Sequence, residues 1–247
     1  MKLAVALWKF ARGLLHVLAG WWTIHFRFPQ FGQQQREASV QAWARRMLDI
    51  VGVGLEVRGQ PGTGPLLLVA NHISWLDILV IHATRHCRFV SKSDVKQWPL
   101  IGALATGAGT LYIERESRRD AMRVVHHMAE RLRAGDVLAV FPEGTTSDGV
   151  TLLPFHANLI QAAVSADAPA QPVALRFVER DTRQTSFAPI YIGDDSLVGS
   201  IWRTLTGPAL DAVVVLGAPG HALGRDRRAW AADLRAEVLR LRGTNLS

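Results

Sequence analysis

The chain has 247 residues, of which 49% are hydrophobic and 20% are charged, and its formal net charge is +7. A chain of this length can bury a full hydrophobic core in one domain, and the sequence contains no internal repeat or low-complexity segment. Cys87 is the sole cysteine, which excludes an intrachain disulfide and fits a reducing compartment.

The positive charge is concentrated in the first 50 residues, which hold seven Lys or Arg against two Asp or Glu. A wide apolar face rich in tryptophan lies beside one basic stripe, which predicts a helix in the interface of an anionic membrane. Because basic residues alternate there with tryptophan, leucine and phenylalanine, lipid is favoured over nucleic acid as the partner. On a helix the stripe would consist of Lys9, Arg12, His16, Gly20, Thr23 and Arg27.

The longest stretch of this helix without Lys or Arg runs from Gly13 to Phe26. At about 1.5 Å per residue it covers roughly 21 Å, short of a hydrocarbon core of about 30 Å, so an interfacial helix is favoured over a spanning one. Lys9 and Arg12 interrupt what would be the apolar region of a signal peptide, so the segment is expected to be retained. A second amphipathic helix near 34–51 would complete a membrane-binding pair in residues 1–52, although an ordinary core-packed helix fits that pattern equally well.

Residues 53–247 alternate between strand-like and helical patterns. This alternation predicts an α/β domain with a largely parallel or mixed central sheet flanked by helices, and with antiparallel strands toward the C-terminus. The expected strands lie near 55–58, 66–70, 88–91, 109–113, 137–141, 172–178, 187–192 and 211–217, and the clearest helices lie at 118–134 and 226–242.

One imidazole and one carboxylate follow the apolar run 66–70, in Asn71-His-Ile-Ser-Trp-Leu-Asp77. Ser74 and Asp77 have the spacing of a helix N-terminus, where the hydroxyl accepts from a backbone amide and the acid lies in the first turn. A helix N-terminus favours a charged carboxylate, so Asp77 would orient His72 and stabilise its protonated form. The pair predicts a general base for an alcohol, although a helix cap and a turn residue also fit the spacing alone.

Three further blocks follow in order: Gly109-Thr-Leu-Tyr-Ile-Glu-Arg115, Phe141-Pro-Glu-Gly-Thr-Thr-Ser147 and Gln171-Pro-Val-Ala-Leu175. Arg115 comes directly after a predicted strand, where its planar fork of donors would suit a phosphate, although a solvated charge fits as well. Pro142 ends another predicted strand and places Glu143 and Gly144 in the loop beyond it. Open α/β sheets bind ligands at this carboxyl edge, which is also where His72 is expected.

The four blocks together resemble the glycerolipid acyltransferase family, which includes the 1-acyl-sn-glycerol-3-phosphate acyltransferases. The resemblance covers residues from about 55 to 180 and extends to Lys92, which would face the acceptor phosphate or be an ordinary surface lysine. It implies these site residues: His72 and Asp77 for catalysis, and Lys92, Arg115, Glu143, Gly144 and Thr145 for substrate binding.

The resemblance implies direct transfer of a fatty acyl group from acyl-CoA or acyl carrier protein to the free hydroxyl of 1-acyl-sn-glycerol-3-phosphate. It also implies a membrane-associated enzyme on the cytoplasmic face of a bacterial inner membrane, and no cofactor. Backbone amides at the start of the Ser74 helix are candidates for stabilising the oxyanion. His82 and His86 have helical spacing but lack an obvious third ligand, so a metal site is not expected.

One position departs from the family pattern, which has arginine after Gly-Thr in the third block, where this chain has Thr146. A phosphate contact would then be missing, so lyso-ornithine lipid and lysophospholipids stay open as acceptors. An acyl thioesterase and a non-catalytic lipid-binding protein are the alternatives from other functional classes. No motif specifies the donor, the acyl chain length or the oligomeric state.

Overall fold

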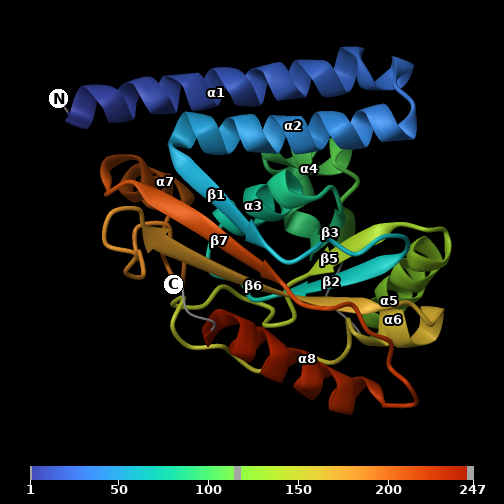
Figure 1. Cartoon of the computed structure of the whole chain (residues 1–247). Helices are drawn as coiled ribbons and strands as arrows, with labels where there is room; N and C mark the ends of the chain where they lie inside the picture. The colour runs from blue at the N-terminus through green and yellow to red at the C-terminus, as the bar shows by residue number, and fades with distance from the viewer. Residues whose placement is uncertain (1, 114–117, 244–247) are drawn as a thin grey trace.

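The structure, a computed structural model, describes residues 2–113 and 118–243. Within them, helices cover both faces of a seven-stranded sheet (Figure 1). The strands are β1 (Val53–Arg58), β2 (Leu66–Ala70), β3 (Arg88–Lys92), β4 (Leu111–Ile113), β5 (Val137–Val140), β6 (Ala170–Glu179) and β7 (Leu210–Leu216). The helices are α1 (Lys2–Phe26), α2 (Gln33–Val51), α3 (Leu76–Thr84), α4 (Ile101–Gly107), α5 (Arg118–Arg133), α6 (Gln161–Ala166), α7 (Leu197–Thr206) and α8 (Arg227–Gly243), with 3-10 turns η1 (Phe28–Gln30) and η2 (Ser93–Gln97).

The sheet has the strand order β1-β7-β6-β2-β5-β3-β4. All neighbouring strands are parallel except β6 and β7, which are antiparallel. The predicted mixed α/β sheet with an antiparallel pair toward the C-terminus is therefore confirmed. The predicted strands and the two clearest helices are present, with ends shifted by at most two residues, apart from one segment.

That segment is 187–192, which was predicted as a strand and is irregular in the structure. The carbonyl groups of Ala188, Pro189 and Ile190 accept from side chains of α7 and not from a neighbouring strand. Ser200 Oγ donates to the carbonyls of Pro189 and Ile190 at 3.3 and 3.2 Å, and Arg203 Nη2 donates to Ile190 at 2.7 Å. Pro189 also lacks the N–H that a ladder requires, so the apolar composition misled the prediction.

Successive residues of each central strand face two different helical layers. On one side Leu66, Leu68 and Ala70 of β2 pack against buried residues of α2 and α3. On the other side Leu67 and Val69 pack against α5, α6 and α8. Burial on both faces explains why β2 is continuously apolar, as is typical of a parallel strand inside an α/β domain.

The N-terminal helix α1 lies along α2, on the side of α2 away from the sheet (Figure 1). Lys9 Nζ donates to the carbonyl of Val51 at 2.9 Å, and the His16 ring stacks on Trp43 with centroids 5.0 Å apart. A Cβ on Gly20 would lie 2.5 Å from Trp43 Nε1, so the close approach of the two helices needs a glycine. Three members of the predicted basic stripe, Lys9, His16 and Gly20, therefore contact α2 and face that helix.

The rest of the α1 surface is apolar and exposed. By length and composition, Leu3–Phe26 is the one helix of the described chain apolar enough to cross a membrane, with a mean hydropathy of 1.3. α1 nevertheless runs alongside the whole of α2, and its N-terminal part extends beyond the end of α2, over α7 (Figure 1). The large exposed side chains are Leu3, Val5, Leu7, Trp8, Phe10, Leu14, Leu15, Leu18, Trp22 and Phe26.

Asn71 connects the end of β2 to β6 through its side chain. Its Nδ2 donates to the carbonyl of Leu175 at 3.1 Å, and its Oδ1 accepts from the N–H of Leu175 at 2.7 Å. Asn71 is buried, so both bonds lie away from water. The side chain thus replaces a backbone ladder pair and frees the main chain to turn at His72.

Asn71→Ala should therefore destabilise the fold strongly. Two buried backbone groups of Leu175 would lose their partners, at a cost of about 1–3 kcal/mol each. Denaturant unfolding would measure the loss, and Asn158→Ala, at an exposed asparagine, is the matched control with an expected change within about 0.5 kcal/mol. Equal stabilities of the two variants would contradict this role of Asn71.

Candidate active site

The candidate site lies where β2, β5 and β3 end. β2 and β5 are parallel neighbours with Val69 opposite Val140, so the segments after them leave the sheet side by side. His72 follows β2, Glu143 follows β5, and Lys92 is the last residue of β3, which also pairs with β5. The carboxyl edge of the sheet therefore brings these predicted residues to one end of the molecule, as expected for an α/β domain.

His72 and Asp77 form a hydrogen-bonded pair. His72 Nδ1 lies 2.7 Å from Asp77 Oδ2, and the two side chains are 19% and 0% exposed. Since a carboxylate accepts, Nδ1 carries the proton and Nε2 is left with a free lone pair. The buried acid therefore fixes both the tautomer and the orientation of a partly exposed base.

The same carboxylate oxygen also forms the turn that leads into α3. Asp77 Oδ2 accepts from the N–H groups of Ile73 and Ser74 at 2.6 and 2.9 Å, and Ser74 Oγ accepts from Leu76 N at 3.2 Å. The predicted N-terminal cap is thus present. The prediction that amides of this turn would stabilise an oxyanion is not supported at residues 73, 74, 76 and 77, because each of these amides already has an acceptor within the protein.

Two residues that the sequence did not single out hold His72 from other sides. The Phe141 ring stacks on the imidazole, with centroids 3.9 Å apart and an interplanar angle of 8°. Ser147 donates to the carbonyl of His72 from both its N–H, at 2.8 Å, and its hydroxyl, at 3.0 Å. Both residues belong to the block 141–147. The order of this block after the block 71–77 was the only sequence feature that linked them to His72.

Glu143 is buried next to the turn that carries His72. Its Oε1 accepts from the N–H of His72 at 2.7 Å, and its Oε2 accepts from the N–H of Leu153 at 2.9 Å. Burial raises the pKa of Glu143 above its ordinary value, although the two amide bonds act in the opposite direction. In this structure Glu143 supports the backbone of the base, and its role in acceptor binding stays a prediction.

The other predicted binding residues differ in what the structure shows of them. Gly144 has a φ of 74°, a left-handed conformation that favours glycine, and Thr145 beside it is exposed. Lys92 is exposed at the end of β3. Arg115 lies outside the described residues, so its predicted phosphate contact stays a prediction.

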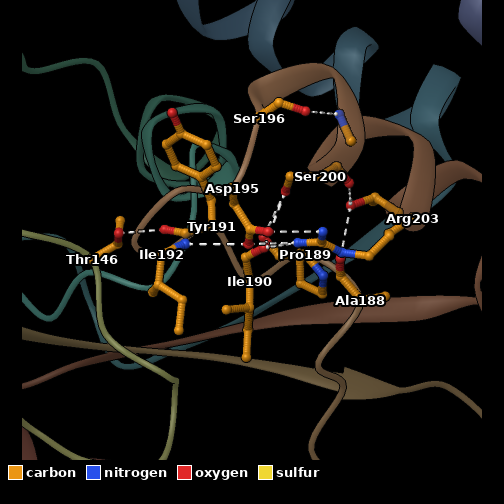
Figure 2. Close-up of polar contacts among 12 residues, drawn as sticks. Thr146, Ala188, Pro189, Ile190, Tyr191, Ile192, Asp195, Ser196, Ser200 and Arg203 are labelled. Carbon is orange, nitrogen blue, oxygen red and sulfur yellow. Dashed lines mark hydrogen bonds and ion pairs between the residues drawn. The ribbon is translucent and has the colours of Figure 1, made fainter.

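Thr146 joins the third block to the segment that precedes α7. Its hydroxyl donates to the carbonyl of Tyr191, while the N–H of Tyr191 donates to the carbonyl of Ile73 at 3.3 Å. Figure 2 shows how Ser200 and Arg203 of α7 hold the same segment from the other side. We call residues 187–206 the α7 clasp, because they connect α7 to the turn that carries His72.

The described residues contain no group of three His, Cys, Asp or Glu side chains placed to hold a metal ion. His82 is buried on α3, with its ring edge against Phe89 at a centroid distance of 5.0 Å. Burial lowers the pKa of His82 to about 3, so this histidine is neutral. Its structural environment is therefore that of an uncharged core residue.

Comparison with known proteins places the chain in a family. The family described as Acyltransferase matches residues 53–176, which include every predicted site residue. The chain belongs to this acyltransferase family. A lyso-ornithine lipid O-acyltransferase of Pseudomonas aeruginosa is 37% identical over 229 residues, 92% of this chain and 88% of that protein. A 1-acyl-sn-glycerol-3-phosphate acyltransferase of Neisseria meningitidis is also 37% identical, over 70% of this chain and 68% of that protein.

The fold of this acyltransferase is also found in a solved structure. The 1-acyl-sn-glycerophosphate acyltransferase of Thermotoga maritima superposes with a TM-score of 0.70, over 99% of this chain and 98% of that one, at 17% identity. The two chains thus share their overall architecture. With the family established, the chain is an O-acyltransferase of the acylglycerol-phosphate acyltransferase type.

Asp77→Asn should remove most acyl transfer while preserving the fold. The amide keeps an oxygen for the amides of Ile73 and Ser74, but it does not stabilise a protonated imidazole as a carboxylate does. We expect kcat to fall by about 10²–10⁴-fold with a smaller change in the KM for the acceptor. Steady-state kinetics and circular dichroism of the same sample would check this, and an unchanged kcat would contradict the assignment.

Glu143→Gln should destabilise the protein in a pH-dependent way. The amide has one oxygen for two N–H donors, which costs about 1–3 kcal/mol. The raised pKa of Glu143 means that the folded native protein holds this proton more tightly than the unfolded chain does. The contribution of Glu143 to the free energy of unfolding is therefore largest at pH values below its ordinary pKa of 4.5, and it falls as pH rises through the pKa of the folded state. The deficit of the variant should narrow over that range, as measured by denaturant unfolding.

Glu237→Gln provides a control of opposite sign. A hydrogen bond from Arg240 lowers the pKa of Glu237, so this carboxylate stabilises the folded state above its unfolded pKa. The deficit of Glu237→Gln should therefore widen as pH rises, and it should be small because the pair is partly exposed. Parallel trends in the two variants would refute the explanation given for Glu143.

Proposed function

We propose that this enzyme transfers a fatty acyl group from an acyl thioester directly to the free hydroxyl of a membrane lysolipid. The observation that carries the proposal is the 2.7 Å contact between His72 Nδ1 and the fully buried Asp77, together with the partial exposure of the His72 side chain. This arrangement gives an oriented base at the carboxyl edge of the sheet, where a lipid hydroxyl and a thioester carbonyl can meet.

The chemical step uses only groups that this site and its substrates supply. His72 Nε2 takes the proton from the lysolipid hydroxyl while the hydroxyl oxygen attacks the thioester carbonyl. Asp77 stabilises the resulting imidazolium through Nδ1. When the tetrahedral intermediate collapses, the carbon–sulfur bond breaks and the imidazolium returns its proton to the departing thiolate. Base assistance of this kind contributes about 10²–10⁴-fold.

The acceptor that the family resemblance implies is 1-acyl-sn-glycerol-3-phosphate, which would make phosphatidic acid for phospholipid synthesis. The Neisseria meningitidis relative supports it by its name. Lys92 supports it by position, since an exposed cation ends the strand next to β5. Arg115 would add a second cation and the loop Glu143–Thr145 would complete the acceptor site.

A lyso-ornithine lipid is the second candidate acceptor, and two observations favour it. The relative that covers more of this chain is a lyso-ornithine lipid O-acyltransferase. Thr146 stands where the family pattern has arginine, and its hydroxyl is occupied by the carbonyl of Tyr191. An amino-acid head group has no phosphate, so it would not need a cation at this position.

Membrane association agrees with the exposed apolar surface of α1 and with the lipid substrates that the relatives' names give. We propose that α1 lies in the membrane interface on the cytoplasmic face of a bacterial inner membrane. Acyl-CoA and acyl carrier protein, the two donors that the resemblance implies, are both soluble thioesters that would reach the site from the aqueous side.

The test is acyl transfer by the purified protein from labelled acyl-CoA and acyl-acyl carrier protein to 1-acyl-sn-glycerol-3-phosphate, other lysophospholipids and lyso-ornithine lipid. His72→Ala should abolish transfer to the preferred acceptor. Release of free fatty acid at a rate independent of added lysolipid would instead indicate a thioesterase. Transfer that persists in His72→Ala would overturn the proposed mechanism.

Position 146 should control the choice between the two acceptors. Thr146→Arg adds a guanidinium that can pair with a phosphate, so kcat/KM for 1-acyl-sn-glycerol-3-phosphate should rise by roughly tenfold relative to lyso-ornithine lipid. Thr146→Val removes the bond to Tyr191 without adding charge, so it should leave this ratio unchanged. The same shift in both variants would show that the charge is irrelevant.

A further inference from the structure

The exposed positions of α7 include two large apolar side chains, and part of its buried face is polar. Ser200 and Thr204 are buried beside Leu205, and their hydroxyls donate to backbone carbonyls: Ser200 to Ile190 beneath the helix, and Thr204 to Ser200 one turn earlier in the helix. Val198 and Trp202, four residues apart on the opposite face, are 68% and 36% exposed. The buried hydroxyls of α7 therefore serve the protein interior, while Val198 and Trp202 leave apolar surface exposed.

The exposed apolar surface continues into the segment before α7. Phe187 is 59% exposed and Ile192 is 38% exposed, although both belong to a segment held firmly by Ser200 and Arg203. This exposure is thus part of an ordered structure. Four large apolar side chains within sixteen residues make a patch larger than scattered surface hydrophobics would give.

The clasp adjoins the helix that carries the main apolar surface of the molecule. α7 packs against α1, near the N-terminal part of α1 (Figure 1). Val5 and Lys9 of α1 line a cavity of about 270 Å³ together with the turn from Thr204 to Leu210. The helix that carries the main apolar surface and the clasp are therefore neighbours in the structure.

We propose that the α7 clasp is a second membrane-contacting element, whose partner is the surface of a phospholipid bilayer. The packing of α7 on α1 decides for lipid over a protein partner, because a bilayer that covers the exposed apolar side chains of α1 would also meet the neighbouring clasp. The exposed side chains of Val198 and Trp202 are uncharged, as suits an interface with acyl chains, and the neighbouring exposed Arg203 is paired with Asp195.

The clasp also connects this lipid surface to the base. Trp75, at the start of α3, donates from its indole to Ser200 Oγ at 3.2 Å, and Tyr191 donates to the carbonyl of Ile73. Contact with lipid at Val198 and Trp202 therefore sets the position of the catalytic turn relative to the membrane. This part rests on the proposed function, and it explains how the hydroxyl of a lipid held in the bilayer reaches His72.

Site-specific fluorescence tests the membrane contact without using activity. Val198→Cys can be labelled selectively with a polarity-sensitive thiol dye, because Cys87 is fully buried and burial raises the pKa of its thiol. Vesicles of phosphatidylethanolamine and phosphatidylglycerol should shift the dye emission to the blue, and doxyl-labelled lipid should quench it. Leu15→Cys on α1 is the positive control, and Leu239→Cys on α8, a leucine that is 50% exposed, is the negative one.

The outcomes separate cleanly. The proposal is supported if vesicles shift the emission of a dye at position 198 as much as that of a dye at position 15, and more than that of a dye at position 239. An unshifted dye at 198 with a shifted dye at 15 overturns it, since α1 would then bind lipid alone. A shift at 198 that needs no vesicles and grows with protein concentration also overturns it, because a second copy of the chain would then cover the clasp.

A double substitution tests the link to catalysis. Val198→Glu with Trp202→Glu should lower vesicle partitioning by about tenfold or more, through loss of two apolar contacts. It should also lower transfer to a lysolipid embedded in vesicles while leaving transfer to a short-chain soluble lysolipid within twofold. Equal losses on both acceptors would overturn the link. If the native protein transferred to neither acceptor, the proposed function would fail while the fluorescence result would still decide the membrane contact.

Discussion

One carboxylate oxygen, Asp77 Oδ2, accepts from three N–H groups: the imidazole of His72 and the amides of Ile73 and Ser74. These bonds determine the course of the chain from β2 into α3 and the orientation of the base at the same time. Because Asp77 is fully buried, its charge is acceptable only while those donors remain in place. The same oxygen therefore serves both the fold of this turn and the His72–Asp77 pair.

A second carboxylate supports the same turn from the neighbouring strand. Glu143 binds the N–H of His72 itself, and Ser147 binds its carbonyl, so both backbone groups of the base are held by the block after β5. Asn71 fixes the preceding residue to β6. The position of His72 is thus fixed by contacts with three parallel strands of the sheet. Proton transfer requires a base that is positioned this precisely.

The central sheet and the His72–Asp77 pair could be predicted because their signals are local. A buried parallel strand is continuously apolar, and a helix cap has a fixed spacing between hydroxyl and acid. The partners of the Glu143 carboxylate could not be predicted, because a glutamate at this position could bind backbone amides or a substrate equally well. The strand prediction for residues 187–192 was wrong for a similar reason, because the donors to the carbonyl of Ile190 lie on a helix that comes later in the chain.

The proposed direct transfer, without an acyl-enzyme, agrees with the hydroxyls that hold the turn at His72. Both are already engaged: Ser74 Oγ accepts from Leu76 N, and Ser147 Oγ donates to the carbonyl of His72. Cys87 is fully buried, and burial raises the pKa of its thiol, which disfavours the nucleophilic thiolate. In the proposed mechanism the oriented base therefore takes its proton from the acceptor's own hydroxyl, which becomes the nucleophile, and no protein side chain carries the acyl group.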